Sequence, residues 1–277
     1  MAQGKEHKML FDLQRGRRRT AVKVVYGILA VLMGASLFLV VGPLNIGELF
    51  NSGSSGSSEI AKPYEEQAER LEAKLKKAPE DQGLLSSLAR ARVTAGKTMV
   101  TAEPTEAVVA EALQQYQLAS SAWAEYLEAT KEPLPGVAQL MAPALFSLAA
   151  EASRTYPQAQ SNLEAASQAQ KIYAEQRPSL NAYSTLAIYT YFTGDYKAAE
   201  AAQAKASKLT RAKFEREQLD KQLGQYKKNA EEFQQRRKQA VAAEKAAAKG
   251  NKGNPESLES PSNALGGAFG TGTGLGE

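Results

Sequence analysis

The chain has 277 residues, of which 43% are hydrophobic, and its formal net charge is +4; this length suffices for one or two domains with a buried core. It contains no cysteine, which excludes a disulfide framework, a thiolate nucleophile and a cysteine-ligated metal. Residues 1–23 carry seven Lys and Arg against two Asp and Glu. This arm accounts for the whole positive surplus, so no nucleic-acid partner is expected.

An uncharged stretch follows the basic arm. Residues 24–41 contain no Asp, Glu, Lys or Arg, and as a helix they cover about 27 Å. The softer residues up to 46 complete a hydrocarbon core roughly 30 Å thick, so we predict a transmembrane helix at 24–46 that contacts the lipid bilayer. A cleaved signal peptide has the same order of features, but this apolar run is longer than a typical signal-peptide core and no A-x-A site follows it.

The charge asymmetry across this span predicts its orientation. By the positive-inside rule, the basic arm at residues 1–23 stays in the cytoplasm. The chain is therefore predicted to be a single-pass protein of the cell membrane, with its body on the extracytoplasmic side. Residues 47–62 include Asn-Ser-Gly-Ser-Ser-Gly-Ser and are expected to form a flexible Gly/Ser linker.

Helical periodicity runs through the body of the chain. Apolar residues recur three and four apart, and no sustained alternation of Val, Ile and Thr indicates a strand. We expect Pro63 in the first turn of the first helix, Gly96 at the end of the second and Thr105 at the start of the third. The predicted fold class is all-α. The expected helices cover residues 63–78, 84–95, 105–132, 136–154 and 162–176.

Residues 180–209 have the pattern of a helical hairpin. Apolar residues of a first helix precede a Gly-Asp turn, and two small residues seven apart follow on a second helix; the residues concerned are Tyr183, Leu186, Ala187, Gly194, Asp195, Tyr196, Ala199 and Ala206. This pattern resembles a tetratricopeptide repeat, a 34-residue helix-turn-helix unit. It departs from that family at Tyr183, where Trp is usual, and at Gln203, where a bulky apolar residue is usual.

Two weaker copies of this unit are expected upstream. A step of 34 residues places Ala149, Ala152, Ser153 and Tyr156 on a first helix and Ala165, Ala169 and Ile172 on a second. A third copy is expected around residues 84–91, with Ala119, Trp123 and Tyr126 on its second helix. The resemblance implies a tetratricopeptide-like solenoid within the domain at residues 63–210; an irregular helical bundle is the alternative.

Residues 211–248 form a charge-rich helical extension. Its apolar stripe can cap the last repeat or form a short coiled-coil seam that makes an oligomer; the stripe contains Leu219, Leu223, Tyr226, Ala230 and Phe233. Gly224 argues against a stiff free rod, and the cap is favoured for the first half of the helix. The tail at residues 249–277 is rich in glycine and is expected to be disordered.

The residue inventory argues against catalysis by this chain. The only histidine is His7 in the basic arm, which leaves the body without a His-based triad, and no metal or other cofactor is expected. Carboxylate pairs such as Glu65 and Glu66 belong to polar helix faces. Trp123 lies on a stripe that predicts a core residue, with an anchor for a bound peptide as the alternative. We expect no enzyme.

Two functions fit this organisation. The first is a membrane-tethered scaffold whose repeats bind a protein or peptide in a helical groove, with Asn181, Ser184, Thr185 and Tyr189 as the candidate lining. In topology it resembles the ancillary tetratricopeptide-bearing subunit of the bacterial Sec translocon, which implies assistance to protein export or envelope assembly. The second is a structural envelope protein whose basic helix binds anionic wall polymer or lipid, because residues 205–252 hold fourteen Lys and Arg against six Asp and Glu.

Overall fold

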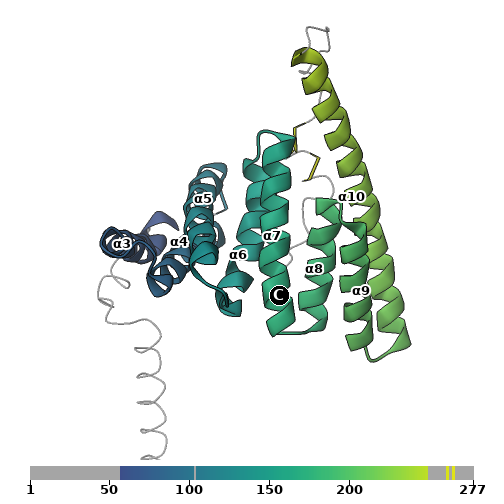
Figure 1. Cartoon of the computed structure of the whole chain (residues 1–277), viewed down its shortest axis with the longest axis horizontal. Coiled ribbons are helices and arrows are strands. Elements are labelled where there is room, and N and C mark those ends of the chain that lie inside the picture. Colours follow the sequence, from purple (N-terminus) through teal and green to yellow (C-terminus); the bar gives the residue numbers. More distant parts are fainter. Residues whose placement is uncertain (1–56, 103, 249–259, 262–263, 266–277) are drawn as a thin grey trace, which may run out of the picture. The chain divides into compact units, whose positions relative to one another are not determined.

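The computed structural model describes residues 57–102, 104–248, 260–261 and 264–265. These residues are helical, with no strand among them, which confirms the predicted all-α class for this part of the chain. Figure 1 labels the helices as used below. Their bounds are α3 Ser57–Leu75, α4 Gln82–Ala102, α5 Glu106–Ala129, α6 Pro135–Ser147, a π-helical turn η1 Leu148–Ala152, α7 Tyr156–Gln176, α8 Leu180–Thr193, α9 Tyr196–Leu209 and α10 Lys213–Ala248.

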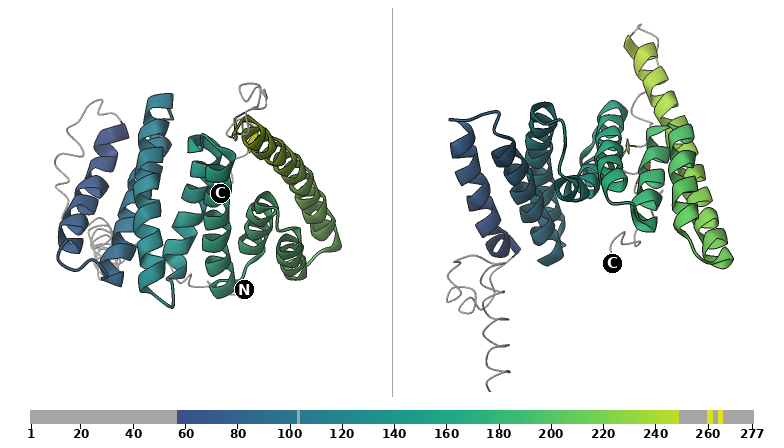
Figure 2. Two further views of the ribbon diagram at one scale, coloured as in Figure 1. Left: turned by 45° about the horizontal axis from the view of Figure 1, so that its top comes forward. Right: turned by 60° about the horizontal axis from the view of Figure 1, so that its bottom comes forward.

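Consecutive helices pack against each other in hairpins. The main pairs are α3 with α4, α4 with α5, α6 with α7, and α8 with α9. Neighbouring pairs then join, because α6 contacts both α4 and α5, and α7 contacts α8. The long α10 closes this stack by packing on α8, with smaller contacts to α7 and α9. Figures 1 and 2 show α10 at one end of the row of helices.

The ends of the helices follow from capping residues. Thr105, Thr155, Ser179 and Asp195 each accept a hydrogen bond at their side-chain oxygen from a backbone N–H in the first turn of α5, α7, α8 and α9. Gly194 ends α8 with a φ of 89°, a left-handed conformation that glycine adopts without strain. The Gly-Asp turn of residues 180–209 is therefore where the sequence predicted it.

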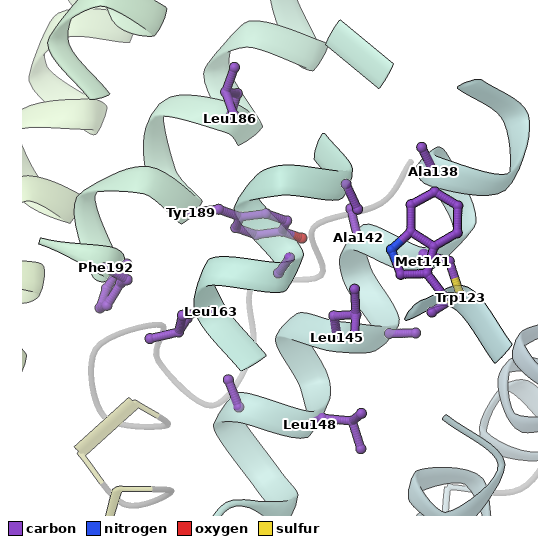
Figure 3. Packing of buried hydrophobic residues seen from close by; sticks show 14 of the residues in the cluster. Trp123, Ala138, Met141, Ala142, Leu145, Leu148, Leu163, Leu186, Tyr189 and Phe192 are labelled. Carbon is purple, nitrogen blue, oxygen red and sulfur yellow. The ribbon is translucent and has the colours of Figure 1, made fainter. Parts of the chain in front are cut away.

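One hydrophobic core runs through the helices from α3 to α10. Trp123 is 2% exposed and lies in this core with Met141 and Leu145 of α6, as Figure 3 shows. Its ring also packs near Tyr126, with centroids 5.5 Å apart. Trp123 is therefore a core residue in this structure, so the interpretation as an exposed peptide anchor is not supported.

Three helices, α3, α4 and α7, extend beyond their predicted bounds, and α7 begins at Tyr156 instead of residue 162. Pro63 lies inside α3 and not in its first turn, because α3 begins at Ser57, within the stretch expected to be a linker at 47–62. Ala61 explains the extension, since it is fully buried in a small cluster with Met99 and Ala112. Gly96 does not end α4 either. A Cβ atom there would lie 2.7 Å from Tyr116 Cε1 and 2.9 Å from the Ala112 carbonyl oxygen, so glycine lets α4 and α5 approach closely.

The upstream repeat differs from its predicted register. The turn after the first helix lies at Ser153 to Thr155, because η1 ends at Ala152 and Thr155 caps α7. Tyr156 is therefore the first residue of α7 and not part of the first helix. The 34-residue step fails here because the stretch from α6 to α7 is longer than the hairpin of α8 and α9.

The tail at residues 249–277 was expected to be disordered throughout, and this is wrong for the tail residues that the structure describes. Pro261 and Ala264 are buried in helical turns, and Leu265 is 0% exposed within the main core. The basic arm and the predicted span at 24–46 lie outside the described residues. Within the described ranges, no helix combines the length and the apolar character that a membrane crossing needs.

Candidate functional site

The residues predicted to line a groove have different surroundings along α8. Asn181 is exposed, and Ser184 and Thr185 are half-buried, with Ser184 Oγ donating a hydrogen bond to the Leu180 carbonyl oxygen. Tyr189 is buried, and its ring stacks on Phe146 of α6 with centroids 4.7 Å apart. Burial also raises the pKa of Tyr189. Tyr189 therefore joins α6 to α8 in the core and does not line a groove.

A hollow lies between the first half of α5 and the turn that joins η1 to α7. We call it the α5–η1 cleft, and its volume is about 620 Å³. Its lining combines apolar, amide and charged side chains, and the polar ones predominate. The lining residues are Ala110, Leu113, Gln114, Gln117, Glu151, Ala152, Ser153, Arg154 and Ser260.

A π-helical turn shapes one wall of this cleft. Ser153 Oγ donates to the Leu148 carbonyl oxygen at 2.9 Å and accepts from Asn162 Nδ2 at 3.1 Å, which fixes the end of η1. The Arg154 backbone N–H donates to Gln158 Oε1 at 3.1 Å and so starts α7. Single π-helical turns occur frequently at functional sites.

Burial raises the pKa of one lining residue of the cleft, Glu151, and of its neighbour Tyr116. Neighbouring groups crowd the carboxyl of Glu151 although much of its side chain is exposed, and this burial raises its pKa. Burial likewise raises the pKa of Tyr116, with a smaller contribution from the Glu151 carboxylate. Gln114 and Gln117 offer both donors and acceptors beside these groups. Hydrogen-bonding groups thus dominate the lining, which suits a polar segment such as a peptide.

The chain's own tail reaches this cleft. Ser260 lies in its lining, and the Ala264 backbone N–H donates to the Ser260 carbonyl oxygen at 3.1 Å. Leu265 follows with its side chain fully buried. Sequence reasoning missed these residues because the surrounding composition is rich in glycine; the pattern Pro261, Ala264, Leu265, with a step of three and then one, was the available signal.

A second hollow of about 420 Å³ lies among α8, α9 and α10. Tyr191 OH donates to Gln203 Oε1 at 2.7 Å, and Gln203 Nε2 donates to Asp220 Oδ1 at 3.0 Å. Lys227 Nζ lies 2.8 Å from Glu200 Oε1. Gln203 stands where the repeat family usually has an apolar residue, and these contacts give it a role in joining α9 to α10.

The apolar stripe of α10 faces its own chain. Leu223 and Phe233 are both buried, and the Phe233 ring lies 5.7 Å from that of Tyr156 and 6.1 Å from that of Phe192. Leu219 and Tyr226 are half-buried against the same core. Since these side chains hold α10 on the body, they do not present the exposed seam that the predicted oligomer contact requires.

Polar contacts add to this attachment. Gln234 Nε2 donates to the Phe192 carbonyl oxygen at 2.6 Å, at the end of α8. Arg237 Nη1 donates to Gln160 Oε1 at 2.9 Å and to Gln234 Oε1 at 2.8 Å. The side chains of Gln160, Gln234 and Arg237 thus satisfy one another's hydrogen-bonding groups in a largely buried place, as a stable buried polar contact requires.

In the part of the chain that the structure describes, no three acidic side chains gather as a metal site would need. Comparisons with protein families, curated proteins and solved structures return no match for this chain.

Proposed function

We propose that this protein is a membrane-tethered scaffold of the tetratricopeptide type that binds a protein or peptide partner on the extracytoplasmic side. The observation that carries the proposal is the α5–η1 cleft, an open hollow of mixed lining that one segment of the chain already contacts through Ser260. A hollow of about 620 Å³ whose lining offers hydrogen-bonding side chains has the size and chemistry for a short peptide segment.

The repeat character rests on the way the hairpins stack. In the hairpin of α8 and α9, Ala199 and Ala206 are fully buried, which allows the two helices to approach closely. Each hairpin continues the core of its neighbour. A terminal helix that covers the last hairpin is what a solenoid needs at its end, and α10 packs in that place.

The tether rests on the sequence. An uncharged stretch at residues 24–46 behind a basic arm supports a single membrane span with the body outside the cytoplasm. Such a body is held near the translocation and assembly machinery of the membrane, which favours a role in protein export or in the assembly of an envelope complex.

The proposal is tested by chemical crosslinking in intact cells, affinity purification and mass spectrometry. The unmodified chain is compared with a cleft variant, Gln114→Arg with Gln117→Arg, and with Gln218→Arg, which changes an exposed glutamine on α10 outside the cleft. We expect a defined set of exported or envelope proteins with the unmodified chain and with Gln218→Arg, and its loss in the cleft variant.

Retention of the same proteins by the folded cleft variant would contradict a partner site in the cleft. Loss of specific partners on neutralising the late cations of α10, with the cleft intact, would instead support the alternative function of a basic helix that binds anionic polymer or lipid.

A further inference from the structure

Several large hydrophobic side chains are exposed at one end of the helical stack. Leu134 precedes α6 and is 50% exposed, Leu180 begins α8 and is 39% exposed, and Leu209 ends α9 and is 46% exposed. Phe214, in the first turn of α10, is 69% exposed. We call these four residues the apolar edge. None of them belongs to the buried core, so packing accounts for only part of their apolar surface.

The hairpin arrangement places these residues at a common edge. Because α8 and α9 form a hairpin, the start of α8 and the end of α9 lie at the same end, and the α9–α10 turn follows directly. Gln176 Nε2 donates to the Pro133 carbonyl oxygen at 2.9 Å, which brings the segment before α6 to the end of α7. The α7–α8 and α9–α10 turns lie along the lower side of Figure 1.

Positive charge accompanies two of the turns at this edge, the α7–α8 turn and the α9–α10 turn. Arg177 is the only charged residue between α7 and α8, and Arg211 is the only one between α9 and α10. Lys208 and Lys213 flank the second turn, while at the other end of the same hairpin the turn carries Asp195. Acidic residues adjoin these turns as well, at Glu175, Glu215 and Glu217, and Glu217 pairs with Lys213 at 3.7 Å. Beside Leu134 the charges are mixed, with Lys131 between Glu128 and Glu132.

Exposed Leu and Phe beside Lys and Arg is the chemistry of a surface that lies at a bilayer interface. The apolar side chains enter the acyl boundary, and the cations contact anionic headgroups. We propose that the apolar edge docks on the surface of an anionic phospholipid membrane. The inference rests on the proposed tether, which would hold the body close to such a surface, and it specifies which edge faces the lipid.

The absence of cysteine makes a direct test available. A single Ala212→Cys in the α9–α10 turn, labelled with an environment-sensitive fluorophore, reports on the edge while Leu209 and Phe214 stay in place. Ala198→Cys is the matched control, because it is also an exposed alanine but lies at the opposite end of α9. The full chain is reconstituted in phosphatidylcholine vesicles with and without phosphatidylglycerol.

We expect a blue shift and quenching by brominated lipid at residue 212 and not at residue 198, with phosphatidylglycerol present. Phe214→Ser should abolish the shift. Arg177→Ala and Arg211→Ala should each lower the ratio of docked to undocked chain about fivefold, since a cation near an anionic surface contributes about that factor.

Equal emission at the two positions, or a shift that persists in Phe214→Ser, would overturn the inference. A shift of the same size without phosphatidylglycerol would also overturn it. Extraction of the vesicles at alkaline pH tests the tether separately. If the chain is extracted but residue 212 still shows the shift, the membrane span is refuted and docking of the apolar edge is supported. If the chain stays inserted but residue 212 shows no shift, docking is refuted and the membrane span is supported.

Discussion

At the residue scale, a missing side chain decides how closely two helices approach. Gly96 lies within α4, and the nearest atoms to a Cβ added there belong to Tyr116 and to the Ala112 backbone of α5. The backbone atom cannot move aside as a flexible side chain can. The same feature explains why a residue that usually ends helices continues this one.

Gly96→Ala should destabilise the protein by about 1–3 kcal/mol, the usual cost of overpacking a tight contact. Gly224→Ala is the matched control, because Gly224 lies within α10 and a Cβ there meets nothing within 4 Å. The control should stabilise by about 0.5–1 kcal/mol through helix propensity. Urea unfolding followed by circular dichroism measures both, and equal effects of the two changes would contradict the close approach.

The raised pKa of Glu151 makes the stability of the fold depend on pH. Its pKa is raised from 4.5 by burial, so the folded state binds the proton more tightly than the unfolded state does. The stabilising contribution of the protonated carboxyl is therefore complete below 4.5 and is lost as pH rises through the raised value. Glu151→Gln should raise the melting temperature at neutral pH and flatten its dependence on pH above 4.5. A profile that Glu151→Gln does not alter would refute this assignment.

At the scale of elements, α10 belongs to the body and is not a free rod. Its contacts combine apolar burial at Leu223 and Phe233 with the polar contacts of Gln234 and Arg237. The pattern of the sequence favoured a cap for the first half of this helix. The contacts reach further along it, because Ala240 is buried as well.

Phe233→Ala should destabilise the protein by about 3–5 kcal/mol, because it removes a buried ring that contacts Tyr156 and Phe192. Phe214→Ala makes the same chemical change on the same helix at an exposed position, and its effect should stay within about 0.5 kcal/mol. Thermal unfolding compares the two variants. Similar losses would mean that α10 does not pack on the body through Phe233.

The described tail residues Ala264 and Leu265 are held on the body by their burial in the main core. Leu265→Ala should cost about 2 kcal/mol or more, as truncation of a fully buried leucine does. Leu209→Ala, at the exposed apolar edge, serves as the control and should cost little. If chemical denaturation finds Leu265→Ala as stable as the unmodified chain, the tail contributes nothing to the core.

At the scale of the whole molecule, sequence reasoning succeeds where the signal is local. The helical class, the caps at Thr105 and Asp195 and the turn at Gly194 all depend on neighbours within a few residues. Sequence reasoning fails where a contact between residues far apart in the chain determines the local structure. Gly96 needs Tyr116 to explain it, and Leu265 is buried only because the body offers it a place.

The candidate site shows the same division. The periodicity of α8 placed Asn181, Ser184 and Tyr189 on one helix, but their exposure depends on α6, which covers Tyr189 through Phe146. The α5–η1 cleft combines α5, a π-helical turn and a tail residue. No periodicity in the sequence links three such segments, so the cleft required the structure.

The central claim is that a partner binds in the α5–η1 cleft of a membrane-tethered body. A photo-crosslinking amino acid at Gln117, in the cleft, tests this claim in intact cells, with the same amino acid at exposed Gln218 of α10 as the control. The account predicts that a discrete protein partner, identified by mass spectrometry, is captured from residue 117 and not from residue 218. Equal capture from both positions, or capture from residue 218 alone, would contradict it.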